Sequence, residues 1–436
     1  MKEKSILKIF LLFILVFIFL LQSAEAERVY LDFTSPVIKR IPTAILLSTP
    51  STEEGKLRIS EKIFNILSND LIFSGVFDII KPSDYPSQSV DTPVDYQAFR
   101  AIGAEVLITC SWKVSGKTLI TEFRHFDTIE QRQRNGKRYR GSIDQLRKMV
   151  HKFANIVYES YTGEKGIFET KIVFVSAISG TKEIYIMDFD GHNVKRLTWN
   201  RSINLSPSWS PDGGKVLFTS YVNRNPDLYC LDLSTGLKRR ISARLGLNAG
   251  AVWSPDGKKI ALMMRKGGGS KIFLINSDGS NPIPLTSGYS NDASPTWSPD
   301  GKKIAFVSNR SGSPQIYIMN SDGTNLRRLT YEGKYNASPA WSPKGDKIAF
   351  ARMENGRFNI FTISPTGENE RRLTENSGNN EDPSWAPNGR FIAFSSNRDG
   401  VSEIYVMNAN GSNQRKITFF KGGETSPSWS PFLSDN

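Results

Sequence analysis

The stretch WSPDGKKIAFVSN, from Trp297 to Asn309, decides the fold of this 436-residue chain because versions of it return at a constant interval. Six tryptophans open these versions, each 44 residues after the one before: Trp209, Trp253, Trp297, Trp341, Trp385 and Trp429. A hydrophobic residue followed by a hydroxyl residue keeps the same interval, at Leu197-Thr198, Ile241-Ser242, Leu285-Thr286, Leu329-Thr330, Leu373-Thr374 and Ile417-Thr418. A period of about 40 to 45 residues is typical of a β-propeller, whose blades each contain four strands.

One repeat predicts the four strands of a blade. Alternating hydrophobic residues indicate strands over residues 294–298, 303–308, 315–320 and 326–330. Pro299, Asp300 and Gly301 predict a tight turn after the first strand, because proline presets φ and glycine accepts the closing position. Asp322-Gly323 predicts the next hairpin turn.

The number of repeats predicts how the ring closes. Second strands begin near residues 171, 215, 259, 303, 347 and 391, and the first of these has no tryptophan strand before it. The last tryptophan strand, at 426–430, has no strands after it. We therefore expect this C-terminal strand to complete the first blade, which removes the open edges of the ring. The tryptophans are expected to fill the gaps between adjacent blades.

The first 26 residues have the pattern of a signal peptide. Lys2, Lys4 and Lys8 precede an apolar run at 9–21, and Ala24-Glu25-Ala26 is a cleavage motif of small residues. An uncleaved N-terminal anchor is the alternative. The pattern predicts an exported, soluble mature protein that starts near Glu27.

Residues 27–165 carry no repeat and predict a small α/β domain. Strands are expected over 29–33 and 44–47, a helix over 57–73, and a hairpin of 105–113 with 117–126. Ser142 and Gln145 form a capping box that opens a helix to about residue 161. A glycine-containing linker at 163–166 leads to the propeller, predicted over 166–436. The predicted fold is an α/β N-terminal domain followed by an all-β six-bladed propeller closed by its C-terminal strand.

The chain is basic, with a formal net charge of +13. The densest cluster is Arg132, Arg134, Lys137, Arg138 and Arg140, for which we weighed a solvated loop against a site for an acidic partner or an anionic membrane surface. We favour the loop, and an exported chain is not expected to bind nucleic acid. Cys110 and Cys230 are expected to be buried and unpaired.

The sequence predicts no enzyme, metal site or cofactor. Its three histidines, His125, His151 and His192, lack metal-ligand spacing, and the common nucleophile, phosphate-binding and zinc motifs are absent. The repeated aspartates at 212, 256 and 300 each lie in a Pro-Asp-Gly turn, so a turn role is favoured over a catalytic one.

A candidate binding rim follows from the repeat. The residue five positions before each tryptophan is always polar: Asn204, Asn248, Asp292, Asn336, Asn380 and Glu424. These side chains either cap their own turns or form a ring on which another protein docks. The residues between the landmarks differ freely, as on a binding rim carried by a constant scaffold: Leu247, Tyr289, Lys334, Tyr335 and Phe420.

The signal segment, the small α/β domain and the six WSPDG-type repeats together resemble the TolB family, periplasmic components of the Tol-Pal system of Gram-negative bacteria. The resemblance implies a monomeric, non-enzymatic scaffold that supports outer-membrane integrity and envelope constriction at division, and that some bacteriocins and phages exploit. It implies that Pal, the peptidoglycan-associated lipoprotein, docks on the propeller rim, including Leu247 and Ala293. Gly250-Ala251 departs from the proline found in the other repeats.

The resemblance also implies that the inner-membrane protein TolA binds the mature N-terminus, Glu27, Arg28, Val29, Tyr30, Leu31, Asp32 and Phe33. This segment is equally consistent with a permanently paired strand. The contrasting hypothesis is a propeller that binds or processes a small molecule or glycan in its channel. Small residues at the inward-facing strand positions favour the scaffold: Ser208, Val252, Thr296, Ala340, Ser384 and Ser428.

Overall fold

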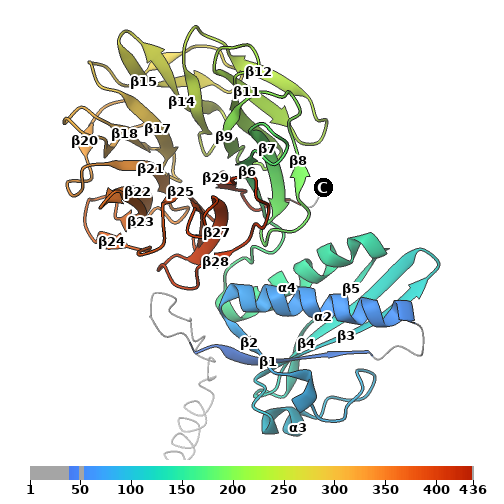
Figure 1. Ribbon diagram of the computed structural model, residues 1–436. Coiled ribbons are helices and arrows are strands. Elements are labelled where there is room, and N and C mark those ends of the chain that lie inside the picture. Colours follow the sequence, from blue (N-terminus) through green and yellow to red (C-terminus); the bar gives the residue numbers. More distant parts are fainter. Residues whose placement is uncertain (1–38, 49–53, 435–436) are drawn as a thin grey trace, which may run out of the picture.

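The computed structural model describes residues 39–48 and 54–434, so the expected signal segment and the strand at 29–33 lie outside the described residues. A small α/β domain is followed by a ring of six four-stranded sheets, which confirms the predicted fold class (Figure 1). In the described part of the chain, no helix combines the length and the apolar character needed to cross a membrane.

The N-terminal domain is built on one five-stranded sheet with the order β2-β1-β3-β4-β5. β1 runs parallel to both of its neighbours, whereas β3, β4 and β5 are antiparallel. The bounds of the strands are β1 (Ile41–Leu47), β2 (Phe77–Ile79), β3 (Val106–Ser115), β4 (Thr118–Asp127) and β5 (Arg132–Ser142). The helices are α2 (Glu54–Ser74), α3 (Tyr96–Ala101) and α4 (Leu146–Thr162), with 3-10 turns η1 (Pro82–Asp84) and η2 (Ile143–Gln145).

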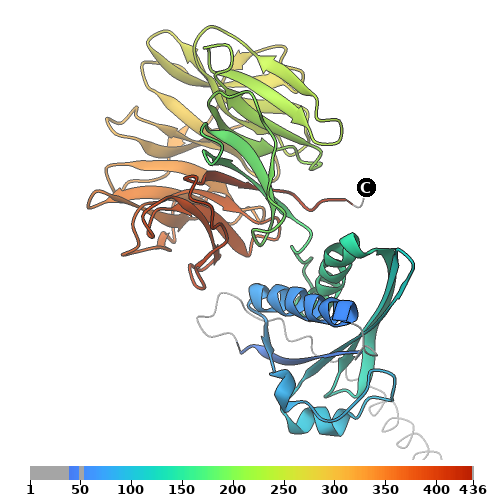
Figure 2. The same ribbon diagram turned by 45° about the vertical axis from the view of Figure 1, so that its right-hand side comes forward.

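Side chains that alternate along the strands build a core on each face of this sheet. Ile45 of β1 and Phe123 of β4 pack under α2 and α4, while Ala44 joins a smaller cluster with Phe99 of α3. The predicted capping box is present, and its Ser142 N–H donates to Gln145 Oε1 at 3.0 Å. The two long helices therefore cover the face turned toward the propeller (Figures 1 and 2).

The basic cluster lies in a strand, so the expectation of a loop was wrong. Arg132, Arg134, Lys137, Arg138 and Arg140 all belong to β5, the edge strand of the sheet. Pairing with β4 places Arg138 opposite Glu122, and the two side chains form an ion pair of 2.5 Å. Cross-strand ion pairs of this kind let a charged sequence adopt a strand, and charge on an edge strand opposes pairing with other sheets.

Each blade of the ring is a four-stranded antiparallel sheet. The predicted second and third strands of the 297 repeat are found without change, as β18 and β19. Strand bounds, sheet by sheet, are β6 (Lys171–Ser176), β7 (Glu183–Asp188), β8 (Lys195–Arg196); β9 (Asn204–Trp209), β10 (Lys215–Ser220), β11 (Asp227–Asp232), β12 (Lys238–Ser242); β13 (Asn248–Trp253), β14 (Lys259–Lys266), β15 (Gly269–Asn276), β16 (Ile283–Pro284); β17 (Asp292–Trp297), β18 (Lys303–Ser308), β19 (Gln315–Asn320), β20 (Arg327–Arg328); β21 (Asn336–Trp341), β22 (Ile348–Glu354), β23 (Arg357–Ile363), β24 (Arg371–Arg372); β25 (Asn380–Trp385), β26 (Phe391–Ser396), β27 (Glu403–Asn408), β28 (Arg415–Lys416); and β29 (Thr425–Trp429).

The C-terminal strand closes the ring as predicted. β29 is hydrogen-bonded to β6, with Trp429 opposite Ile172, and completes the sheet β29-β6-β7-β8. The Ser430 N–H donates to the Lys171 carbonyl at 2.8 Å, and the Lys171 N–H donates to Ser430 Oγ at 3.0 Å. Strands from the two ends of the propeller sequence therefore lie side by side, and the ring has no open blade.

The repeated tryptophans pack between sheets. Trp341 belongs to a cluster with Ile316 and Ile318 of the preceding sheet. The indole N–H of Trp385 donates to the Ala340 carbonyl of the preceding sheet at 3.0 Å. The tryptophans therefore join adjacent blades by both apolar contact and hydrogen bonding.

The repeated hydroxyl explains why the fourth strand of the 297 repeat is shorter than predicted. The strand was predicted over residues 326–330, but β20 contains only Arg327 and Arg328. The side chain of Thr330 takes over: its Oγ1 accepts from the Ile316 N–H at 2.9 Å. Thr198, Thr286, Thr374 and Thr418 accept from the equivalent N–H groups at 2.8 to 3.0 Å. A side chain thus replaces the backbone carbonyl where the chain leaves the sheet.

The two domains share one hydrophobic core. Phe73 at the end of α2 contacts the rings of Phe189 and Phe391, with centroids 4.8 and 5.6 Å away. The Arg415 guanidinium lies 3.4 Å from the centroid of the Phe73 ring and donates to the Phe73 carbonyl at 2.7 Å. Glu164, in the connection between α4 and β6, accepts from Lys344 Nζ at 3.0 Å. These contacts fix the N-terminal domain against one side of the ring.

Candidate functional site

The candidate site is the end of the ring where the chain passes from one sheet to the next. Six loops of five residues connect the repeated hydroxyl to the first strand of the following sheet. We call them the rim loops: 199–203, 243–247, 287–291, 331–335, 375–379 and 419–423. A surface made of loops on a rigid ring is a common arrangement for binding.

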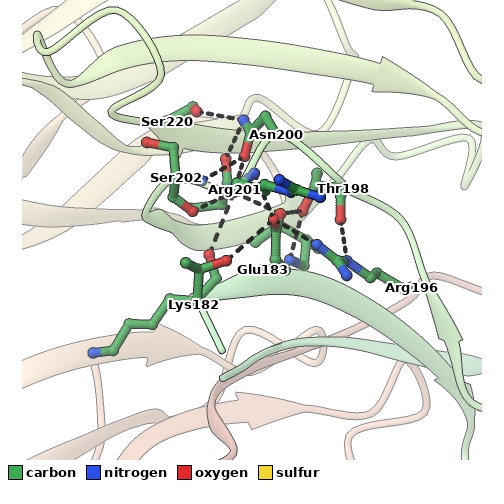
Figure 3. Close-up of polar contacts among 11 residues, drawn as sticks. Lys182, Glu183, Arg196, Thr198, Asn200, Arg201, Ser202 and Ser220 are labelled. Atoms are coloured by element: carbon green, nitrogen blue, oxygen red, sulfur yellow. Dashed lines mark hydrogen bonds and ion pairs between the residues drawn. The ribbon is translucent and has the colours of Figure 1, made fainter. Parts of the chain in front are cut away.

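A buried polar network holds the first rim loop in place (Figure 3). Glu183, the first residue of β7, is fully buried, and its Oε1 accepts from Arg196 Nη2 at 2.8 Å and from the Arg201 N–H at 3.1 Å. Its Oε2 accepts from Asn204 Nδ2 at 2.8 Å and from the Thr198 hydroxyl. One carboxylate therefore ties together both ends of the loop and a backbone N–H within it.

The same arrangement recurs in the other sheets with different side chains. In the fourth sheet, Gln315 takes the place of Glu183, and its Oε1 accepts from Thr330 Oγ1 at 2.9 Å and from Asn336 Nδ2 at 2.8 Å. In the third sheet, Lys271 takes this place, and its Nζ lies 3.9 Å from Asp292 Oδ2. Buried polar groups need such partners because an unpaired one is costly.

The six polar residues predicted to form the docking ring are instead buried. Their side chains have no exposed surface: Asn204, Asn248, Asp292, Asn336, Asn380 and Glu424. Each opens the first strand of its sheet or immediately precedes it, and the observed contacts are those of the capping alternative. These buried side chains support the rim loops from inside the ring and have no exposed surface that a partner could contact.

Two further predicted rim residues are partly exposed. Leu247 lies at the end of the second rim loop, and Ala293 follows the buried Asp292 in β17. The expected TolA-binding residues, 27–33, lie outside the described residues.

Exposed apolar side chains on the rim loops are a feature that the sequence prediction found only in part, since it named Tyr289 and Tyr335 as rim residues but not the others. Five of the six loops carry at least one large apolar side chain that is more than a third exposed: Trp199, Ile203, Leu245, Tyr289, Tyr331, Tyr335 and Phe419. Leu245 and Tyr289, in neighbouring loops, are almost wholly exposed. The sequence signal was available, because Trp199, Tyr331 and Phe419 each directly follow the repeated hydroxyl. Exposed apolar groups gathered on one surface are typical of protein-interaction sites.

A second repeated feature lies within the first strands. The residue three before each tryptophan has a positive φ of 48° to 59°, and the pairing register shifts there: Ser206, Gly250, Ser294, Ser338, Asp382 and Ser426. Such a bulge redirects a side chain from its strand. Asp382 accepts from Ser338 Oγ at 2.8 Å and from Ser426 Oγ at 2.9 Å, so one carboxylate connects three sheets.

The inward-facing positions named in the sequence also connect neighbouring sheets. Thr296 Oγ1 accepts from the Trp341 N–H at 3.2 Å, and Ser384 Oγ accepts from the Trp429 N–H at 2.9 Å. Burial raises the pKa of the nearby Glu381 carboxyl, and Asp382 adds to the rise. Within the described residues, no group of three or more histidine, cysteine or acidic side chains is placed to hold a metal ion.

Comparison with known families gives two matches along the chain. Residues 158–433 match the family described as "TolB beta propeller domain", and residues 29–134 match "TolB amino-terminal domain". The first match alone covers more than half of the chain.

Comparison with individual proteins gives matches to TolB proteins as well. Two proteins named Tol-Pal system protein TolB, from Desulfosudis oleivorans and Geobacter sulfurreducens, are 39% and 42% identical over 194 and 193 residues. Each alignment covers 43% of this chain and 44% of the relative, so the match spans less than half of those proteins. The solved TolB structure from Acinetobacter baumannii aligns with a TM-score of 0.79 at 24% identity, over 90% of this chain and 97% of that one, and supports the fold.

Proposed function

The chain belongs to the TolB family, and on that premise we propose that it is a non-enzymatic scaffold of the Tol-Pal system in the periplasm. In this proposal a Pal-like peptidoglycan-associated lipoprotein docks on the rim loops. A TolA-like inner-membrane protein binds the mature N-terminal segment 27–33. Binding of a partner at one site would change the conformational order of the other site. The assembly would support outer-membrane integrity and envelope constriction at division.

The observation that carries the proposal is the set of exposed apolar side chains on the rim loops. Leu245 and Tyr289 protrude from adjacent loops whose ends are held by buried hydrogen bonds. Little conformational freedom would be lost when a partner covers such a supported surface, so more of the contact energy remains as affinity. Leu247 and Ala293 lie in the same region and belong to the proposed contact surface.

The test is binding of the purified mature protein to the soluble domain of a peptidoglycan-associated lipoprotein, measured by calorimetry. The double variant Leu245→Ser/Tyr289→Ser should weaken binding at least 10-fold, because buried aromatic and aliphatic anchors dominate interfaces. Leu237→Ser is the control, since Leu237 is 71% exposed but lies in the turn before β12, at the end of that strand opposite the rim loop. Equal loss in the control and the double variant would count against rim docking.

A second comparison tests the N-terminal site. A version lacking residues 27–33 should retain the lipoprotein and lose an inner-membrane partner in a pull-down from envelope extract. If neither partner is captured by either form, the scaffold proposal fails, and the small-molecule hypothesis becomes the leading one.

A further inference from the structure

The buried polar pairs under the rim differ in one sheet from all the others. In each sheet a polar or charged residue in the first three positions of the third strand is followed, 21 positions later, by a polar residue at or just before the start of the next first strand. The pairs are Glu183 with Asn204, Asp227 with Asn248, Lys271 with Asp292, Gln315 with Asn336, Asn359 with Asn380, and Glu403 with Glu424. Every pair but the last contains an amide or ammonium donor. The last contains two carboxyl groups.

Both carboxyl groups of this last pair are buried and face one another. Glu403 is 4% exposed and Glu424 is fully buried, and they occupy the repeat positions of Gln315 and Asn336, whose side chains are hydrogen-bonded at 2.8 Å. Glu403 Oε2 accepts from Thr418 Oγ1 at 2.6 Å, and Glu424 Oε1 accepts from Ser176 Oγ at 2.8 Å. Glu424 Oε2 is buried and has no hydrogen-bond partner among the described residues. A donor is therefore missing from the place where the other pairs have one.

The surrounding charges do not supply that donor to Glu424. Lys416 of β28 lies 3.1 Å from Glu403 Oε1 and is shared with Asp399, 3.6 Å away. Arg398, in the loop before β27, donates to Gln414 and Asn380. Lys421, on the rim loop beside the pair, is exposed, and the residue that β6 presents to Glu424 is the neutral Ser176.

We propose that Glu403 and Glu424 form a proton-binding site at the point where the ring closes. One proton held between the two carboxyl groups replaces the amide or ammonium donor of the other sheets. Glu403 belongs to β27 and Glu424 directly precedes β29, so the proton joins the last complete sheet to the strand that closes the propeller. Loss of the proton leaves two buried negative charges that repel each other and weaken this closure.

The pH dependence follows from the direction of the pKa change. Burial raises the pKa of Glu424 from about 4.5 to about 7; the Ser176 hydroxyl opposes the rise and Glu403 adds to it. Between these values the folded protein binds a proton that the unfolded chain has released. Stability therefore declines as pH rises through this window, and the loss is complete above the folded pKa.

The test compares wild type with Glu424→Gln, which supplies the amide donor found in the Gln315 pair. Thermal and urea unfolding are measured from pH 5 to pH 8.5. The variant should unfold like wild type near pH 5, while above pH 7 its folding equilibrium constant should exceed that of wild type by up to about 100-fold. Glu183→Gln is the matched control, because its partner Asn204 already carries an amide. That variant can change overall stability but should not alter the pH dependence.

Three outcomes would overturn the proposal. The first is a constant stability difference between wild type and Glu424→Gln at all pH values. The second is a wild type whose stability at pH 8 is restored by Ca²⁺ or Na⁺, which would make the pair a cation site. The third comes from wild type alone and does not depend on the variant folding: a Glu424 carboxyl that titrates near pH 4.5 by NMR, rather than near 7.

Discussion

At the scale of single residues, the same residue type has opposite roles in different positions. Trp385 is buried between two sheets and donates to a backbone carbonyl, whereas Trp199 lies on a rim loop and is 62% exposed. Burial of a large aromatic side chain removes about 150 to 250 Å² from water, so the first contributes to stability. The second is available to a partner.

Replacing each tryptophan by alanine separates these roles. Trp385→Ala should lower the free energy of unfolding by about 3 to 5 kcal/mol, since it leaves a cavity between sheets and removes a hydrogen bond. Trp199→Ala should change it by less than about 0.5 kcal/mol. Urea unfolding followed by circular dichroism measures both, and equal losses would contradict the assignment.

Two turn glycines make a similar contrast. Gly279 and Gly236 both have positive φ, of 92° and 73°. A Cβ at Gly279 would overlap the Ile241 carbonyl of the preceding sheet, but a Cβ at Gly236 would meet no atom within 4 Å. Gly279→Ala should therefore cost about 3 kcal/mol or more, against about 1 kcal/mol for Gly236→Ala, where only backbone strain remains. Thermal unfolding of the two variants side by side measures the difference.

At the scale of elements, β29 has the largest influence for its length. This five-residue strand comes from the C-terminal end of the propeller sequence, whereas β6, β7 and β8 of the same sheet come from its start, and it pairs with β6 across 250 to 257 positions. By pairing with β6 it covers an edge of the first sheet that would otherwise be unpaired.

Deleting residues 422–436 should open the ring. We expect the shortened protein to lose its cooperative unfolding transition and to aggregate, because the first sheet loses its innermost strand and Trp429. Near-ultraviolet circular dichroism and light scattering would report this. Addition of a peptide of residues 422–436 should restore part of the signal, and a monomeric shortened protein with wild-type stability would contradict the role given to β29.

At the scale of the whole molecule, Arg415 joins the ring to the N-terminal domain. Its guanidinium lies against Phe73, and burial lowers its pKa to about 10, with Arg40 contributing. The equivalent residue in the preceding sheet, Arg371, is exposed. The contact between Arg415 and Phe73 therefore distinguishes the last sheet from the preceding one.

Arg415→Ala should loosen this contact, and Arg371→Ala serves as its control. Loss of the hydrogen bond and the cation–ring contact costs about 1 to 3 kcal/mol. Calorimetry should then show the N-terminal domain unfolding at a lower temperature than the ring, while the control unfolds like wild type. Limited proteolysis of the connection at 163–170 should be several-fold faster in Arg415→Ala alone. Indistinguishable behaviour of the two variants would exclude a special role for Arg415.

The sequence by itself determined the ring, because the features that build it are local and repeated. Turn residues such as Pro299, Asp300 and Gly301 act within a few positions, and a 44-residue period places every blade alike. The strand conformation of the basic run in β5 was harder to predict from the sequence, because it depends on pairing with Glu122 on a neighbouring strand.

Only the tertiary structure decided which rim residues are buried and which are exposed. Asn204 is equally polar whether it caps a loop or faces a partner, and the choice depends on Glu183, which comes 21 residues earlier and meets it only in the folded sheet. In the same way, Glu403 and Glu424 are two ordinary acidic residues until the ring closes and buries them together. Desolvation and pairing are properties of three-dimensional neighbourhoods, and a linear pattern does not contain them.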